Sequence, residues 1–359
     1  MPLMLRFDRV LIWTILAMVL FGLLMVYSAT ASSGASGSAH FVKQLVAAVI
    51  GLALMYGLMF VNYRSLRDPR VVFTVLAVAV LMLVIAAGLG TGANTRRFLR
   101  LGPLSLQPSE LAKPAIILYL AYHFERYRDK MHLGQALVKP VLVVSLLAGL
   151  IIAGRDFGTT ACLVLLAGTL IFLAGVPLRW LASAALVAAA LLSVFVFMEP
   201  YRVKRLLVFL EPEADPLGGG FQVIQSGIAV GSGGLLGKGW MAGKQKMDFL
   251  PEAHSDFMFA MVGEELGLIG TALLVVGFAV ILWRGLRAAT STPDRFGFYL
   301  AAGVTVMIVS QAMLNMGVVL GMLPTKGMPL PFISYGGSSL WTTLAASGGL
   351  LSVSRLSQS

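Results

Sequence analysis

The sequence predicts an all-α protein that crosses a membrane about ten times, and two observations support this. Of the 359 residues, 58% are hydrophobic and 12% are charged, whereas soluble domains carry about 25% charged residues. In addition, apolar runs of roughly 20 residues recur along the chain, and a helix of that length crosses the ~30 Å hydrocarbon core of a bilayer. No soluble domain is recognisable between them, so residues 1–359 are interpreted as one membrane domain.

The apolar runs, taken in order, give the predicted spans. Arg6 and Arg9 precede the first run without a small-residue cleavage site, which predicts a retained first helix and not a removed signal peptide. A long connection, 199–256, separates the seventh run from the eighth and is expected on the extracytoplasmic side. The runs are 10–30, 39–61, 71–90, 108–123, 138–153, 158–176, 178–198, 257–283, 296–320 and 336–354.

Basic residues in the short connections predict the orientation, because such loops are retained in the cytoplasm. With a cytoplasmic N-terminus, the inner loops contain about half of the 27 Lys and Arg residues, and both termini lie inside. A net charge of +11 in a soluble protein would suggest a nucleic-acid partner. Here the basic loops explain most of this charge, so no nucleic-acid partner is expected.

Several cations oppose this pattern, because they fall on the predicted outer side. One interpretation is a pocket for an anion, especially a phosphate, which would offset the cost of placing them there. The alternative is that they contact lipid headgroups. Their proximity to Pro, Gly and acidic residues favours the pocket. The residues are Arg96, Arg97, Arg100, Lys113, Arg155 and Lys326.

Two outer segments place carboxylates near these cations. Glu110 and Lys113 are three residues apart at the start of a predicted helix and therefore share a face. This ion pair is either purely structural or held beside a substrate. Asp156 precedes another span, where it is interpreted first as a helix cap and second as a ligand for a hard cation such as Mg²⁺.

The stretch Phe249 to Phe257 leads from the long connection into the eighth span and contains Glu252, His254 and Asp256. Asp256 is a candidate general base, and His254 is the alternative because imidazole titrates nearest neutrality. Glu264 and Glu265 are interpreted as the outer boundary of the span that follows.

Other kinds of site are disfavoured. Cys162 is the single cysteine and the four histidines have no paired spacing, which argues against thiolate or histidine metal sites. The sequence Gly231-Ser232-Gly233-Gly234 follows no strand and lacks a Walker lysine, so ATP-driven transport is not expected.

Three stretches resemble the SEDS family (shape, elongation, division and sporulation), whose members include FtsW, RodA and SpoVE. They are far apart in the chain, occur in the order of the family and extend the resemblance over nearly its whole length. They are Gln107-Pro108-Ser109-Glu110-Leu111-Ala112-Lys113, Phe249-Leu250-Pro251-Glu252-Ala253-His254-Ser255-Asp256-Phe257, and Asn315 through Gly321-Met322-Leu323-Pro324 to Pro331-Phe332-Ile333-Ser334-Tyr335-Gly336-Gly337.

The resemblance implies ten membrane helices and a peptidoglycan glycosyltransferase that polymerises lipid II and releases undecaprenyl diphosphate. It also implies a bacterial plasma-membrane location with the site facing outward, a class B penicillin-binding protein as partner, and other divisome or elongasome membrane proteins. A divalent cation, Mg²⁺ or Mn²⁺, is expected. The family's catalytic aspartate falls on Asp256, and the expected substrate-binding residues are Arg97, Arg100, Gln107, Glu110, Lys113, Lys326 and Ser334.

The sequence departs from the family pattern at one position and does not match a single branch of the family. Relatives usually carry Pro immediately before the acid at Asp156, whereas this chain has Arg155. Some motifs, such as Lys244-Gln245-Lys246, resemble FtsW, whereas Gly237-Lys238-Gly239-Trp240 resembles RodA; the balance favours FtsW slightly. A lipid II flippase is the rival function, because intramembrane charges also serve transporters, and a scaffold without activity is a third possibility.

Overall fold

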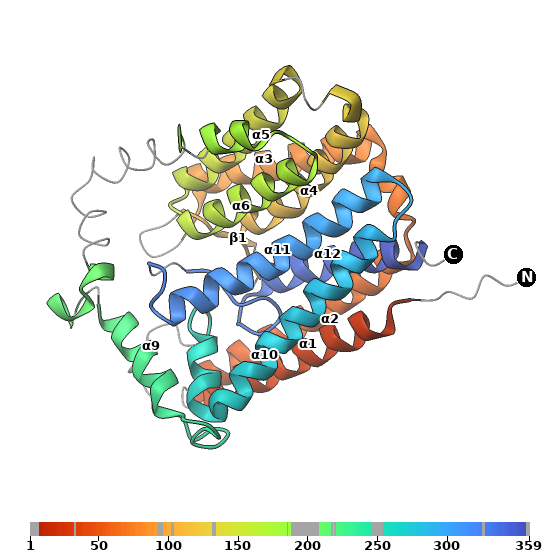
Figure 1. The fold of residues 1–359 in the computed structure, drawn as a ribbon. Helices are drawn as coiled ribbons and strands as arrows, with labels where there is room; N and C mark the ends of the chain where they lie inside the picture. Colours follow the sequence, from red (N-terminus) through yellow and green to blue (C-terminus); the bar gives the residue numbers. More distant parts are fainter. Residues whose placement is uncertain are drawn as a thin grey trace, which may run out of the picture.

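The structure is a computed structural model of the chain and consists almost entirely of helices (Figure 1). The residues it describes are 7–31, 34–91, 96–101, 104–130, 134–184, 186–187, 208–216, 218, 220–245, 254–324 and 327–356. Helices occupy nine of the ten predicted span positions, and most of the seventh, 178–198, lies outside the described residues. The long helices are α1 (Arg9–Thr30), α2 (Gly34–Phe60), α3 (Pro69–Leu89), α4 (Pro108–Arg126), α5 (Gly134–Ala153), α6 (Phe157–Leu173), α10 (Met258–Thr290), α11 (Arg295–Val319) and α12 (Gly337–Leu356).

Short elements connect some of these helices. The 3₁₀ turn η2 precedes α3, the hairpin β1–β2 precedes α4, and the helix α9 lies inside the predicted long connection 199–256. The sequence analysis treated this connection as a loop and did not predict α9. The short elements are η2 (Tyr63–Arg67), β1 (Leu99–Leu101), β2 (Leu104–Leu106), η3 (Arg128–Lys130), η4 (Pro212–Ala214) and α9 (Phe221–Ser232).

Local capping explains where several helices begin. A carboxylate at the N-cap accepts a hydrogen bond from an otherwise unpaired backbone N–H in the first turn. Asp8 accepts from Leu11 N at 3.0 Å at the start of α1, and Asp294 accepts from Gly297 N at 2.9 Å at the start of α11. These polar caps end the apolar runs at the membrane boundary.

The surface of the bundle is suited to lipid. Six of the described helices are long and apolar enough to cross a bilayer. Large apolar side chains project outward from them, among them Trp13, Leu81 and Leu273, which are 69%, 60% and 66% exposed. Such a belt would be unfavourable in water but matches hydrocarbon. The protein is therefore a multi-pass membrane protein.

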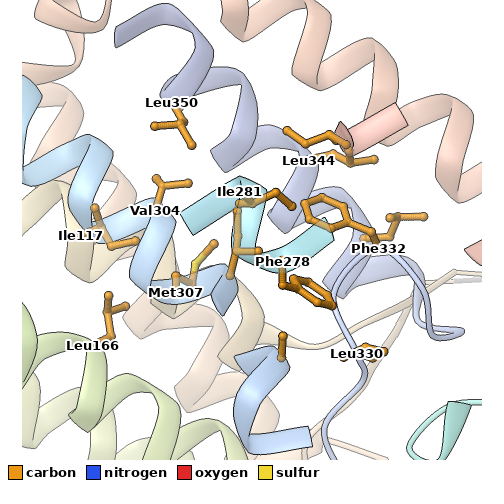
Figure 2. Close-up of a cluster of buried hydrophobic side chains, with 14 of the residues drawn as sticks. Ile117, Leu166, Phe278, Ile281, Val304, Met307, Leu330, Phe332, Leu344 and Leu350 are labelled. Carbon is orange, nitrogen blue, oxygen red and sulfur yellow. The ribbon is translucent and has the colours of Figure 1, made fainter. Parts of the chain in front are cut away.

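Helix α11 forms the centre of the bundle. It contacts α4 and α6 on one side and α10 and α12 on the other (Figure 1), and most of its span is buried. Apolar side chains from these helices form one continuous core, in which Met307 of α11 lies among Ile117 of α4, Leu166 of α6 and Ile281 of α10 (Figure 2). A helix buried on all sides can present polar groups inward without exposing them to lipid.

The segment between α11 and α12 folds into the bundle. Phe332 and Ile333 are 2% and 0% exposed, and Phe332 lies beside the apolar core (Figure 2). A Cβ on Gly22 of α1 would lie 2.3 Å from the Phe332 carbonyl oxygen, so only glycine permits this approach. Irregular backbone at membrane depth requires protein around it and internal hydrogen bonds. Gln44 of α2 supplies two of these bonds, donating to Ser334 O at 3.1 Å and accepting from Gly336 N at 3.1 Å.

Helix α10 breaks near its start, where Gly267 has φ 64° and ψ −157°. Glu264 and Glu265 immediately precede the break and are fully buried. Their carboxylates accept hydrogen bonds from the loop after α9, including Lys244 N to Glu264 at 2.9 Å and Met241 N to Glu265 at 3.0 Å. The two acids therefore lie directly before a break within α10, and their carboxylates hold the loop after α9 against it. Their predicted position at the outer boundary of a membrane span stays a prediction.

The opposite end of the bundle contains the start of α1 and the end of α12, far from α9 (Figure 1). Asp8 pairs with Arg284 of α10 at 2.7 Å, and Arg355 of α12 donates to Phe60 O at 3.3 Å. Tyr63 is fully buried and donates its phenolic hydrogen to Asp294. These contacts join α1 to α10, α2 to α12, and η2 to the start of α11 at the end away from the candidate site.

Candidate functional site

Asp256 and Arg97 meet at Gly327, although they are distant in sequence. A Cβ built on Gly327 would lie 2.9 Å from Oδ2 of Asp256 and 3.1 Å from Nη1 of Arg97. The Arg97 guanidinium also donates to the Gly327 carbonyl at 3.4 Å. Both side chains are half-buried. The predicted base and one of the predicted cations are thus brought together in a partly sheltered place.

The backbone around Arg97 is fixed by its neighbours. Arg96 N donates to Gly154 O at 3.3 Å, and Thr91 and Phe98 exchange backbone hydrogen bonds before the β1–β2 hairpin. The guanidinium of Arg97 lies over the Phe98 ring, 5.1 Å from its centroid. Its Nε is buried and has no partner among the described residues. This nitrogen is an unsatisfied buried donor, which is uncommon because buried polar groups are normally paired.

Asp256 lies in a turn directly before α10 and is held from two directions. Asn315 of α11 donates to the Asp256 carbonyl at 2.9 Å, and Tyr335 N donates to the His254 carbonyl at 2.9 Å. The His254 ring packs against Tyr335 and His40, with centroid distances of 5.4 and 5.3 Å. Of the two candidate bases, the geometry therefore favours Asp256, because His254 faces an aromatic cluster and Asp256 faces Arg97.

Glu110 and Lys113 form a buried ion pair on α4, as their spacing predicted. Lys113 Nζ lies 3.0 Å from Glu110 Oε2, and both side chains are 2% exposed. Lys113 also donates to the side-chain oxygen of Gln311 on α11. An ammonium has three donors, and no third partner for Lys113 lies among the described residues. The Gln311 amide in turn donates to Pro329 O at 2.9 Å, two residues along the chain from Gly327.

Gln107 and Asp156 form a second cluster beside the first. Oδ2 of Asp156 accepts from Gln107 Nε2 and from Ser109 Oγ, both at 2.7 Å, and Oδ1 accepts from Thr159 N at 3.2 Å. Asp156 is therefore the N-cap of α6, which was the first interpretation of this residue. The preceding Arg155 has φ 62°, a conformation that proline cannot adopt, so the Pro common in relatives does not fit this turn.

The donors around Asp156 do not fit a metal site. Both of its oxygens already accept from the protein, and no group of three His, Cys, Asp or Glu side chains suited to a metal occurs in the described ranges. A hard cation such as Mg²⁺ normally takes one or two carboxylates together with substrate phosphates. In this chain, Asp156 is a helix cap and does not provide such a ligand.

The remaining predicted site residues are less informative. The hydroxyl of Ser334 accepts from Leu330 N at 2.9 Å, and its side chain is buried within the loop. Arg100 lies in β1 opposite Ser105, but its side chain is outside what the structure describes. Lys326 also lies outside the described residues. Their proposed contacts with a substrate therefore stay predictions.

Four residues that organise the site were not predicted as site residues, although Asn315 and Gly327 lie within a stretch that resembles the family. They are Gln44, Gln311, Asn315 and Gly327. Gln311 and Asn315 are four residues apart in an apolar span and project from the same face of α11. Polar side chains on one face of a membrane helix indicate an internal polar surface, so this spacing could have identified them. The role of Gly327 depends on its contacts with Asp256 and Arg97, which exist only in the folded chain.

The comparisons with known proteins agree with this arrangement. A family model described as "Cell cycle protein", which represents FtsW, RodA and SpoVE, matches residues 8–359. A probable peptidoglycan glycosyltransferase FtsW from Geobacter metallireducens is 40% identical over 97% of this chain and 95% of its own length. The stage V sporulation protein E of Bacillus subtilis is 40% identical over 98% of both chains.

Two solved structures share the fold. One, described as "Structural coordination of polymerization and crosslinking by a peptidoglycan synthase complex", has a TM-score of 0.81 and 31% identity and covers 98% of both chains. The rod shape determining protein RodA of Thermus thermophilus has a TM-score of 0.74 and 28% identity over 99% of this chain and 98% of its own. The chain therefore belongs to the SEDS family, the FtsW, RodA and SpoVE proteins.

Proposed function

We propose that the protein is a peptidoglycan glycosyltransferase that polymerises lipid II into β-1,4 glycan strands and releases undecaprenyl diphosphate. Relatives that match the chain over nearly its whole length are named as such enzymes. The observation in this chain that supports the proposal most directly is the placement of Asp256 and Arg97 against Gly327. A base and a cation placed together suit a transfer with an anionic leaving group.

In this mechanism, Asp256 accepts the proton of the 4-hydroxyl on the acceptor GlcNAc. The freed oxygen forms a bond to the anomeric carbon of the donor sugar while the bond from that carbon to the diphosphate oxygen breaks. One displacement inverts the anomeric centre, so an α-linked lipid gives a β-linked glycan.

The cations stabilise the negative charge that develops on the departing diphosphate. Arg97 would donate from its unpaired Nε. Lys113 would donate the third N–H of its ammonium, since the other two are bonded to Glu110 and Gln311. Arg100 and Lys326 belong to the same proposed cationic surface. Holding two lipid-anchored substrates in fixed orientation contributes a further large part of the rate.

We propose a divalent cation, Mg²⁺ or Mn²⁺, only because the resemblance to the SEDS family implies one. Because the Asp156 donors do not fit a metal, no step of the mechanism depends on one. Polymerisation measured with EDTA, followed by addition of Mg²⁺ or Mn²⁺, tests this point. Recovery of activity would support a cation requirement, and full activity in EDTA would exclude it.

We further propose that the site faces the outside of the bacterial plasma membrane, with both termini in the cytoplasm. The start of α1 and the end of α12 lie at the end of the bundle opposite α9, which agrees with this orientation (Figure 1). A class B penicillin-binding protein and other divisome or elongasome membrane proteins are the proposed partners. The structural relative described as a peptidoglycan synthase complex supports the first of these. Relatives named FtsW favour division over elongation.

Flippase activity is the less favoured function. A transporter needs polar groups along a path between both faces, usually with a site near the midplane. Here the polar groups assigned to the site gather at one end, and the polar groups at the opposite end pair with one another, as Asp8 does with Arg284. The geometry therefore suits glycosyl transfer at one face of the membrane better than transport of lipid II across it.

Purified protein supplied with labelled lipid II in vesicles tests the proposal. Glycan chains that a muramidase digests are the expected product. Translocation of lipid II without polymer would identify a flippase instead. If neither polymer nor translocated lipid II is detected, whether the penicillin-binding partner is present or not, the protein is a scaffold.

A further inference from the structure

Asn315 connects the two segments that meet at the candidate site. Its side-chain amide donates to the Asp256 carbonyl at 2.9 Å and to the Met328 carbonyl at 2.7 Å. Met328 follows Gly327, the residue against which both Asp256 and Arg97 lie. We propose that Asn315 is a positioning residue for the glycosyl transfer, which sets the separation of Asp256 and Arg97 without touching the reacting atoms.

The chemistry of an amide suits this role. Two carbonyl groups from different segments need two N–H donors on one short side chain, and the Asn amide supplies both with no charge. Asn315 is 2% exposed, so a charged donor there would be costly. Its own Oδ1 is buried and has no partner among the described residues. An unpaired buried acceptor is destabilising, so the two donors of Asn315, and not its packing alone, account for an amide at this position.

The rigidity of its support makes Asn315 an effective anchor. It projects from α11, the most enclosed of the helices that qualify as membrane spans. Gln311, one turn earlier on the same face, donates to Pro329 O at 2.9 Å. The loop from Gly327 to Pro329 is thus tied twice to α11, and Asp256 is tied once to the same helix. Loss of the Asn315 donors would release Asp256 and one of the two loop attachments together.

The inference rests on the proposed function, and the experiment separates the two. Asn315→Ala and Asn315→Ser are compared with the wild-type protein and with Ser310→Ala. Ser310 is also buried on α11, but its hydroxyl donates to Met307 O of its own helix and contacts Cys162, not the loop. Measurements are kcat and KM for polymerisation of lipid II, equilibrium binding of lipid II, and the thermal unfolding midpoint in detergent.

For Asn315→Ala we expect kcat to fall by about 10²-fold, the size of loss that a displacement near 1 Å can cause. KM and lipid II binding should stay close to wild type, whereas the unfolding midpoint should fall modestly because two carbonyls lose their donor. Every property of Ser310→Ala should stay close to wild type. Asn315→Ser keeps one donor, so its kcat should lie between those of the wild type and Asn315→Ala. If Asn315→Ala does not fold, the kcat of Asn315→Ser tests the inference instead.

Wild-type kcat in both Asn315 variants would overturn the inference. It would also be overturned by a loss of kcat matched by an equal loss of lipid II binding, or by a loss of folded protein large enough to account for the lower kcat, because those results describe a structural residue. No polymer from the wild-type protein would overturn the proposed function instead, and with it the reaction that Asn315 is proposed to serve.

Discussion

Arg97 and Asp256 approach the same point on the backbone at Gly327, one from the segment before the β1–β2 hairpin and the other from the turn before α10. Neither segment contacts the other through regular secondary structure. Their relative position depends on the loop between α11 and α12, which the amides of Gln311 and Asn315 hold to the centre of the bundle. The site is therefore built from three separate segments around one buried helix.

Replacement of Asp256 by Asn should abolish polymerisation without unfolding the protein. The amide keeps the size of the side chain but cannot take the acceptor proton, and loss of a general base costs about 10²–10⁴-fold in rate. Polymer yield from labelled lipid II measures the effect, and lipid II binding by the same variant provides the control. Polymer at the wild-type level would exclude Asp256 as the base.

Replacement of Gly327 by Ala should reduce kcat strongly, because the new methyl group would lie 2.9 Å from Asp256 and 3.1 Å from Arg97. One or both side chains must then move. Gly168→Ala in α6 is the matched control, since nothing lies within 4 Å of the added Cβ and Ala is favoured over Gly in a helix. Equal polymerisation by the two variants would show that the Arg97–Asp256 spacing is unimportant.

Much of the fold could be predicted because lipid imposes a simple rule on sequence. Apolar runs long enough to cross a bilayer gave helices at nine positions in the described residues, and Asp156 capped α6 as its position suggested. The Glu110–Lys113 pair followed from the three-residue helical spacing alone. These features are local, so a short window of sequence contains all the information they need.

The missed features are contacts between distant segments. Nothing in the residues around Gly327 indicates that Arg97 and Asp256 will lie against it, and the two Gln44 bonds to the loop before α12 have the same long-range character. Helix α9 was missed because its 12 residues are too few to give a membrane span and lie within a glycine-rich connection. The two contacts depend on tertiary packing, which a short window of sequence does not contain.

Replacement of Tyr63 by Phe should lower stability at neutral pH and change its dependence on alkaline pH. Tyr63 is buried and donates to Asp294, the cap of α11. Burial, followed by the hydrogen bond to Asp294, raises the pKa of Tyr63 to about 12, above the ordinary value of about 10. The unfolded chain therefore loses this proton first as the pH rises.

The stabilisation from the neutral phenol is thus complete below about pH 10 and disappears as the pH rises through about 12. Unfolding midpoints of the wild type and Tyr63→Phe in detergent, measured at pH 8 and pH 11, should differ at pH 8, and the difference should be clearly smaller at pH 11. A constant difference between the two proteins at both pH values would show that the hydroxyl is not the source. Polymerisation at pH 8 should change little, since Tyr63 lies at the far end of the bundle.

The Glu110–Lys113 pair can be tested for a catalytic role separately from its structural one. Lys113→Met alone leaves a buried carboxylate without its partner, which costs about 3–5 kcal/mol in comparable pairs, so both stability and activity should fall. Glu110→Gln with Lys113→Met removes both charges at similar volume and should restore the unfolding midpoint. We expect polymerisation to stay low in the double variant, because no ammonium then meets the diphosphate, and lipid II binding should be weaker than in wild type. Recovery of polymerisation together with stability would instead make the pair purely structural and leave Arg97 as the cation nearest the described base.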